Sequence, residues 1–231
     1  MAVVHNSRVD LRVGNDGTQA LIVRPDDDKK YPAVVMVQEW WGIEPHVMGL
    51  ANQLALEGFV VVVPDLYHGK VATEPNDAMR LLMLLRDNVD RAVNEIISAL
   101  DTAKSLPNTE TTKPGLIGFC LGGFLTYTTA AKYADLGAAM PFYGGSYDPT
   151  PAEVAKVTAP VFAVYGSQDD SIPADQRAKI ESLYKEAGKN FTMRVYDAGH
   201  AFMNPDHGAG NAAAAADIWP QMVKFLQDNI K

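Results

Sequence analysis

Short runs of β-branched and other apolar residues alternate with longer helical patterns along most of this chain of 231 residues. This alternation constrains the fold more than any other feature. The runs are apolar throughout rather than at every second position, which is typical of strands buried on both faces of a sheet. Strands that alternate with helices form a mostly parallel sheet with helices on both faces. The sequence therefore predicts an α/β fold.

The individual elements are predicted from the apolar runs and from apolar residues spaced three or four positions apart. The longest helical pattern breaks at Asp87 and Asn88, which indicates two helices rather than one. We expect strands over 31–39, 59–65, 115–119, 137–144, 159–166 and 191–197. We expect helices over 46–57, 75–105 with that break, 121–133, 174–188 and 211–230.

The segment Val9–Val23 has a different pattern. Two stretches of alternating apolar and polar residues flank the turn sequence GNDG at 14–17, a strong hairpin signal. We therefore expect an N-terminal β-hairpin. The chain has no internal repeat and no linker long enough to separate domains, so one domain over 1–231 is the simplest interpretation.

The composition limits the class of protein. Apolar residues make up 47% of the chain, and the formal net charge is −8. Nucleic acid and anionic membrane surfaces would both repel this charge, so we expect neither as a partner. The single cysteine excludes an internal disulfide. The chain lacks a signal-like apolar segment at its start and any apolar run long enough to cross a bilayer. We expect a cytoplasmic protein that is a monomer or a small homo-oligomer.

Four chemically active side chains stand where predicted strands end. Glu39 ends one strand, Cys120 directly follows another, and Asp169 and His200 lie just past two later strands. The carboxyl ends of parallel strands meet at the same edge of a sheet, and ligands bind there. The sequence therefore predicts that these four side chains form one site.

Cys120 lies in the sequence GFCLGG, with Gly118 and Gly122 two positions to either side. This is the nucleophile-elbow pattern with cysteine in place of serine. The glycines leave room for a sharp turn from strand into helix. The turn puts the sulfur at a helix N-terminus, where the dipole and free N–H groups stabilise a thiolate and the N–H of Leu121 points to a developing oxyanion. The alternative is an inert, buried thiol.

A nucleophilic thiol needs a base, and the base needs a carboxylate to orient it. His200 and Asp169 supply these groups. The order Cys120, Asp169, His200 is the order nucleophile, acid, histidine that accompanies the elbow pattern. The adjacent Asp170 is the alternative acid. The alternatives without catalysis are a turn former at Asp169 and a surface loop histidine at His200.

Four motifs taken together, VQEWWG, GFCLGG, GSQDDSIP and GHAFMNP, resemble the dienelactone hydrolases, also called carboxymethylenebutenolidases, of the α/β-hydrolase superfamily. The resemblance extends from residue 31 to the C-terminus. It implies an α/β-hydrolase fold and a catalytic triad of Cys120, Asp169 and His200. It also implies that the N–H of Trp40 is a second oxyanion donor.

The same resemblance implies a role for Glu39. In that family a glutamate after an early strand holds the resting thiol neutral, until substrate displaces the glutamate and the thiolate forms. An apolar pocket with Trp40 and Trp41 nearby makes two close anions unfavourable, so a shared proton is physically reasonable. The alternative is a solvated glutamate at a strand end.

The chain departs from the family pattern where the substrate carboxylate binds. The family members that act on dienelactone bind its carboxylate with arginines, one of them four residues after the catalytic histidine, and this chain has Asn204 there as a candidate substrate-binding residue. A neutral amide cannot replace a bidentate guanidinium. Arg80 or Arg86 could supply a positive charge instead, and Tyr143 and Trp41 could line the pocket. The alternatives are a solvated helix face for the arginines and core packing for the aromatic residues.

These features predict a hydrolase that opens an enol-lactone through a thioester acyl-enzyme, with a small lactone or ester as its partner. Two alternatives stay open. One is a broader carboxylesterase or thioesterase that uses the same triad, and the other is a non-catalytic or redox-sensing protein in which Cys120 is the switch. The chain has no glycine-rich phosphate motif and no zinc-type histidine spacing, so neither a cofactor nor a metal is expected.

Overall fold

The computed structural model describes residues 3–11, 17–207 and 210–230. Within these residues, eight strands form one sheet in the order β1-β2-β4-β3-β5-β6-β7-β8. Strands β3 to β8 run parallel to one another, whereas β2 is antiparallel to both of its neighbours. The α/β architecture with a mostly parallel sheet is confirmed.

All six predicted parallel strands are present, and each ends within two residues of its expected boundary. They are buried because helices cover the sheet, which explains why their sequences are apolar throughout. Their bounds are β3 (Ala33–Val37), β4 (Val60–Pro64), β5 (Gly115–Phe119), β6 (Ala138–Phe142), β7 (Val161–Gly166) and β8 (Phe191–Tyr196).

The N-terminal strands β1 (Val4–Asp10) and β2 (Gln19–Pro25) form the expected antiparallel pair, with Asp10 opposite Gln19. Strand β1 starts earlier than the predicted Val9, because most of its side chains are exposed at the sheet edge and carry no apolar pattern. The predicted turn residues 14–16 lie outside the described residues.

The long helical pattern divides at Asp87 and Asn88 as predicted. The short helix α5 was not predicted, although Thr150 and Glu153 form a capping box at its start. The helices are α1 (Pro45–Leu56), α2 (Pro75–Arg86), α3 (Val89–Ser105), α4 (Leu121–Ala130), α5 (Pro151–Lys156), α6 (Ala174–Glu186) and α7 (Ala212–Asn229).

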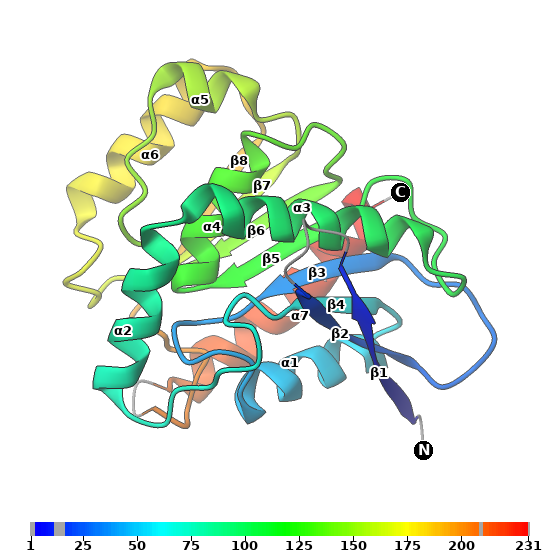
Figure 1. Ribbon diagram of the computed structural model, residues 1–231. Coiled ribbons are helices and arrows are strands. Elements are labelled where there is room, and N and C mark those ends of the chain that lie inside the picture. The colour runs from blue at the N-terminus through cyan, green and yellow to red at the C-terminus, as the bar shows by residue number, and fades with distance from the viewer. Residues whose placement is uncertain (1–2, 12–16, 208–209, 231) are drawn as a thin grey trace.

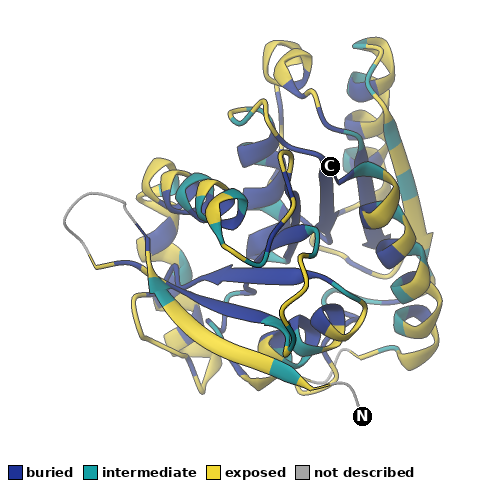
Figure 2. Cartoon of the chain, turned by 90° about the vertical axis from the view of Figure 1, so that its right-hand side faces the viewer, coloured by how far each residue is buried: buried dark blue, intermediate teal, exposed yellow. Residues whose placement is uncertain are grey.

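The helices cover both faces of the sheet (Figure 1). Helices α3 and α4 pack on one face, while α1 and α7 pack on the other. Figure 2 shows the buried strands as the dark centre of the molecule, with exposed residues on β1 and on the outer faces of the helices. In the described part of the chain, no helix has both the length and the apolar character that a membrane span requires. This layering leaves the carboxyl ends of the parallel strands as the place where loops form a site.

Candidate active site

The predicted side chains come together at the carboxyl ends of four strands. Glu39 follows β3, Cys120 follows β5, Asp169 follows β7 and His200 follows β8. Nδ1 of His200 lies 2.6 Å from Oδ2 of Asp169. The sulfur of Cys120 interacts with the same imidazole strongly enough to alter its pKa. The structure therefore places a thiol, an imidazole and a carboxylate in a row.

Cys120 occupies a sharp turn between β5 and α4. Its φ of 54° and ψ of −111° lie in a region that side chains rarely adopt, and it is the N-cap residue of α4. Its N–H donates to the carbonyl of Phe142, and its carbonyl accepts from the N–H of Phe124, both at 3.1 Å. Leu121 begins the helix, so its N–H belongs to the first turn, where N–H groups lack partners within the helix. The half-buried thiol therefore lies at the N-terminus of α4.

The glycines around Cys120 allow α4 to approach the backbone of neighbouring strands. A Cβ atom on Gly118 would lie 2.2 Å from the carbonyl oxygen of Gly122, and one on Gly122 would lie 2.5 Å from that of Val37. Gly123, whose role was missed from the sequence, has the same constraint, because its Cβ would lie 2.3 Å from the Phe142 oxygen. The close approach requires three glycines, of which the elbow pattern identified two.

We expect the substitution Gly122→Ala to destabilise the protein by about 3 kcal/mol, because the added methyl group overlaps fixed backbone atoms. The control is Gly49→Ala in α1, where an added Cβ meets no atom within 4 Å and alanine favours the helix by about 1 kcal/mol. Urea unfolding measures both free energies. Equal stabilities of the two variants would contradict this account of the turn.

Asp169 is the carboxylate that contacts His200, whereas Asp170 is exposed. The side chain of Asp169 is buried, and its Oδ1 accepts hydrogen bonds from N–H and Oγ of Ser171 at 3.0 and 2.5 Å. Burial acts to raise the pKa of Asp169, but the hydrogen bonds from His200 and Ser171 outweigh it and keep that pKa below its ordinary value. Asp169 is therefore held as a charged, oriented carboxylate. Ser171 was not singled out from the sequence, although an Asp-x-Ser turn commonly has this hydrogen bond.

His200 lies between the carboxylate and the sulfur. Burial acts to lower its pKa, but the hydrogen bond to Asp169 and the interaction with Cys120 raise it to about 10. The ring also lies edge-on against Tyr143, with centroids 5.2 Å apart. His200 is therefore held between Asp169 and Cys120.

The raised pKa of His200 predicts how stability depends on pH. The folded protein holds the imidazole proton up to about pH 10, whereas the unfolded chain releases it near 6.5. The stability from this group is therefore complete below pH 6.5 and is lost as the pH rises towards 10. We expect urea unfolding between pH 6 and pH 10 to show this decline, and the Asp169→Asn variant to show a smaller one. If the free energy of unfolding falls equally with pH in the two proteins, Asp169 does not raise the pKa of His200.

Glu39 is buried beside this row, with 1% of its surface exposed. The hydroxyl of Tyr143 donates to its Oε1 at 3.1 Å, and Nδ2 of Asn204 donates to its Oε2 at 2.6 Å. Burial raises the pKa of Glu39, and these two hydrogen bonds partly offset that rise. Each carboxylate oxygen therefore has one donor from the protein.

A second layer lies behind Glu39. Nδ2 of Asn204 also donates to Oε1 of Glu44 at 3.1 Å, and Oε2 of Glu44 lies 2.8 Å from Nε2 of His207. The ring of His207 stacks on Trp41, with centroids 3.7 Å apart. Glu44 and His207 were not identified from the sequence as part of the site. Asn204 and Trp41, considered there as substrate-binding residues, are both buried and face this layer.

The remaining predicted residues have other surroundings. Arg80 is exposed on α2 and pairs with Asp77 at 3.3 Å. Arg86 donates to Oγ of Ser146 at 2.9 Å. Trp40 lies in the loop directly after Glu39. Among the residues that the structure describes, no group of three or more His, Cys, Asp or Glu side chains is arranged to hold a metal ion.

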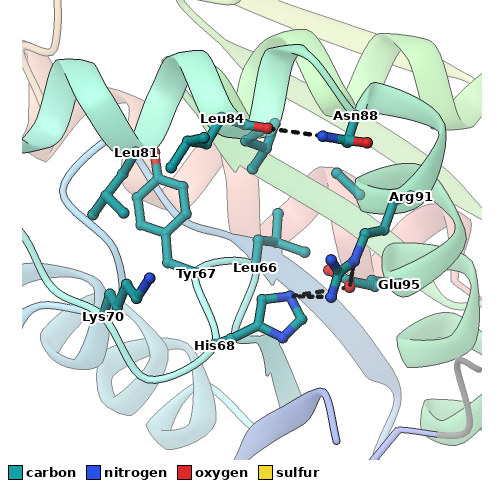
Figure 3. A pocket seen from close by; sticks show the side chains of 11 residues that line it. Leu66, Tyr67, His68, Lys70, Leu81, Leu84, Asn88, Arg91 and Glu95 are labelled. Carbon is teal, nitrogen blue, oxygen red and sulfur yellow. Dashed lines mark hydrogen bonds and ion pairs between the residues drawn. The ribbon is translucent and has the colours of Figure 1, made fainter. Parts of the chain in front are cut away.

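Tyr67 lies near the site and was not predicted from the sequence to belong to it. Within the described ranges its buried hydroxyl has no hydrogen-bond partner, and burial followed by the charge of Cys120 raises its pKa. Its ring borders a cavity of about 270 Å³ between the loop after β4 and helices α2 and α3 (Figure 3). On the far side of this cavity, His68 and Arg91 contact the buried carboxylate of Glu95 at 3.1 and 3.0 Å. Tyr67 therefore lies within electrostatic range of the thiol and also lines the cavity.

Comparisons with known proteins identify the family of this chain. The family model of the dienelactone hydrolase family matches residues 18–230. The chain is 32% identical over 226 residues to the "Putative carboxymethylenebutenolidase" of Salmonella typhimurium, a match that covers 91% of this chain and 83% of that protein. It is 31% identical over 204 residues to "Protein usf" of Aquifex pyrophilus, which covers 85% and 88% of the two chains.

Solved structures show the same fold. The crystal structure of a dienelactone hydrolase-like promiscuous phosphotriesterase from metagenomic libraries superposes with a TM-score of 0.91 over 99% of both chains, at 20% sequence identity. The strand order and the sharp turn from β5 into α4 are those of an α/β-hydrolase fold. Because the family model matches nearly the whole length of this chain, the chain belongs to the dienelactone hydrolase family.

Proposed function

We propose that this protein is a carboxylic ester hydrolase that opens an enol-lactone through a thioester on Cys120. One observation carries the proposal: the thiol lies at the N-terminus of α4 beside His200, and the other side of that imidazole binds the buried Asp169. A thiol, a base and an orienting carboxylate are the parts that nucleophilic acyl transfer requires. The names of the carboxymethylenebutenolidase relatives support a lactone such as dienelactone as the substrate.

The first half of the reaction acylates the enzyme. The thiolate of Cys120 attacks the ring carbonyl carbon, a C–S bond forms and the carbonyl electron pair moves onto oxygen. The N–H groups of Leu121 and Trp40 are the proposed donors to this oxyanion. When the carbonyl re-forms, the ring C–O bond breaks and its oxygen becomes an enolate, which takes the proton of the His200 imidazolium and leaves that imidazole neutral. The ring is then open and its acyl group is a thioester.

The second half releases the product. His200, oriented by Asp169, accepts a proton from water, and the hydroxide oxygen attacks the thioester carbon. The C–S bond breaks, the sulfur leaves as a thiolate and the acyl group leaves as a carboxylic acid. The proton on His200 restores the paired imidazolium and thiolate. One water is consumed for each ester bond.

A second candidate function is a broader carboxylesterase or thioesterase that uses the same residues. It is favoured by Asn204, which lies where the family members that act on dienelactone have a substrate-binding arginine. Both amide hydrogens of Asn204 instead bind carboxylates of the protein. Parallel assays with dienelactone, p-nitrophenyl acetate and an acyl thioester separate the two. Efficient turnover of the simple esters without turnover of dienelactone would select the broader enzyme.

A role for Cys120 as a redox switch without catalysis is separated by alkylation. The chain has one cysteine, so iodoacetamide modifies the proposed nucleophile alone among its thiols. We expect hydrolysis to be lost in proportion to the fraction of Cys120 alkylated. Full activity in the alkylated protein would overturn the proposed mechanism.

A further inference from the structure

Asn204 lies four residues after His200, yet it has no exposed surface. Its Nδ2 donates to Glu39 at 2.6 Å and to Glu44 at 3.1 Å, and its Oδ1 accepts the backbone N–H of Asp206 at 3.1 Å. Both amide hydrogens and the amide oxygen are therefore occupied. This orientation is the favourable one, because a flipped amide would turn its oxygen towards two carboxylates and lose the bond from Asp206.

The carboxylate of Glu39 is also held from its other side. The hydroxyl of Tyr143 donates to Oε1, so that Tyr143 and Asn204 occupy one oxygen each. Tyr143 is fully buried, and its ring packs against His200. Hydrogen bonds to a charged group are strong where water is excluded. Among the described residues, the hydrogen bonds of this carboxylate go to Tyr143 and Asn204, not to Cys120.

Glu44 and His207 support Asn204 from behind. A second carboxylate next to Glu39 is unfavourable by itself, and the charge of Glu44 does act to raise the pKa of Glu39. Nε2 of His207 lies 2.8 Å from Glu44 and supplies a counter-charge when protonated. The stack of His207 on Trp41 holds that imidazole in place. The amide of Asn204 therefore bridges two carboxylates, each of which has a further partner.

We propose that Asn204 is a positioning residue that clamps the carboxylate of Glu39, so that the thiol of Cys120 is paired with His200 before any substrate binds. This inference rests on the proposed role of Cys120 as the nucleophile. A charged glutamate that is free to reach a resting thiol accepts a hydrogen bond from the S–H and disfavours a second anion beside it, so the proton stays on sulfur and the sulfur stays neutral. A Glu39 held by Tyr143 and Asn204 does not accept this hydrogen bond. The thiol is then active without a charged group on the substrate, and uncharged esters and lactones are sufficient substrates.

The rate at which iodoacetamide alkylates Cys120 measures the resting thiolate directly, because the reagent is uncharged and the chain has no other cysteine. We expect Asn204→Ala to lower the second-order rate constant at pH 7 about tenfold. The freed, charged Glu39 then accepts a hydrogen bond from the thiol, and the proton stays on sulfur. Unchanged alkylation in this variant would overturn the clamp.

A double variant separates positioning from a loss of packing. Adding Glu39→Gln to Asn204→Ala removes the competing carboxylate, so we expect the alkylation rate to return to within about threefold of the wild-type rate. A purely structural defect would persist or worsen in the double variant, and that outcome would overturn the proposal. The matched control is Asn211→Ala, which removes the cap of α7 in the same region of the chain without contacting Glu39.

Tyr143→Phe is the second variant if Asn204→Ala does not fold. It removes the other donor to Glu39 while keeping the buried ring, and we expect about a threefold slower alkylation that Glu39→Gln again reverses. An unchanged rate in Tyr143→Phe would count against the clamp. Alkylation needs no turnover, so these results stand apart from the hydrolysis assays. If the wild-type protein hydrolyses no ester or lactone while the variants show the expected changes in alkylation rate, the proposed function is wrong and the clamp stands.

Discussion

Replacement of Cys120 by alanine is expected to lower kcat/KM for every ester or lactone substrate by about 10⁵-fold or more, since removal of a nucleophile removes the covalent route itself. The fold should be retained, because alanine and cysteine have similar difficulty with the φ of 54° at this turn. Steady-state kinetics with dienelactone and with p-nitrophenyl acetate measure the loss. Thermal unfolding followed by circular dichroism checks the fold.

Cys120→Ser is the informative companion variant. A serine hydroxyl can still be deprotonated by His200, but it forms an ion pair with an imidazole far less readily than a thiol does, so we expect activity between those of the wild type and the alanine variant. A pre-steady-state burst of p-nitrophenol in the wild type would report the thioester. If Cys120→Ala hydrolyses esters as fast as the wild type, the nucleophile lies elsewhere.

Asp169→Asn is expected to give the second largest effect, a loss in kcat of about 10³–10⁴-fold. Asparagine keeps the size of the side chain, but its amide can donate to Nδ1 of His200 and so favour the wrong tautomer. The same substitution removes the carboxylate that raises the pKa of His200, so alkylation of Cys120 at pH 7 should slow as well.

The chain contains a matched control for this variant at the next position. Asp170→Asn changes the same chemical group on an exposed side chain, and we expect kcat within about twofold of the wild type, as is usual for surface substitutions. Equal losses in the two variants would mean that the assignment of the acid is incorrect. A loss in Asp170→Asn alone would make that residue the acid.

The parallel strands were predictable because burial on both faces selects apolar residues at every position of a short run. The first residues of strand β1 and the short helix α5, which were not predicted, lack such a signal. Strand β1 is exposed at the sheet edge, and helix α5 has six residues, too few to show a helical period. In both cases the pairing or packing with neighbouring elements stabilises a segment whose own pattern is weak.

The positions of Cys120, Asp169 and His200 were predictable for a different reason. A sharp turn from strand to helix needs glycines at fixed offsets from its apex, and side chains that directly follow parallel strands meet at one sheet edge. These requirements are local, so they appear in short stretches of sequence. The sequence also identified Asn204 as a departure from the family pattern, but it did not indicate what Asn204 contacts.

The sequence by itself determined the strand-and-helix order, the turn at Cys120 and the set of polar residues at the strand ends, because each depends on neighbours along the chain. Only the tertiary structure decided the partners of Glu39. Its carboxylate binds Tyr143 and Asn204, which are 104 and 165 positions away. Such contacts follow from the strand order of the sheet and from the path of the loops above it, and no local pattern encodes which oxygen meets which donor.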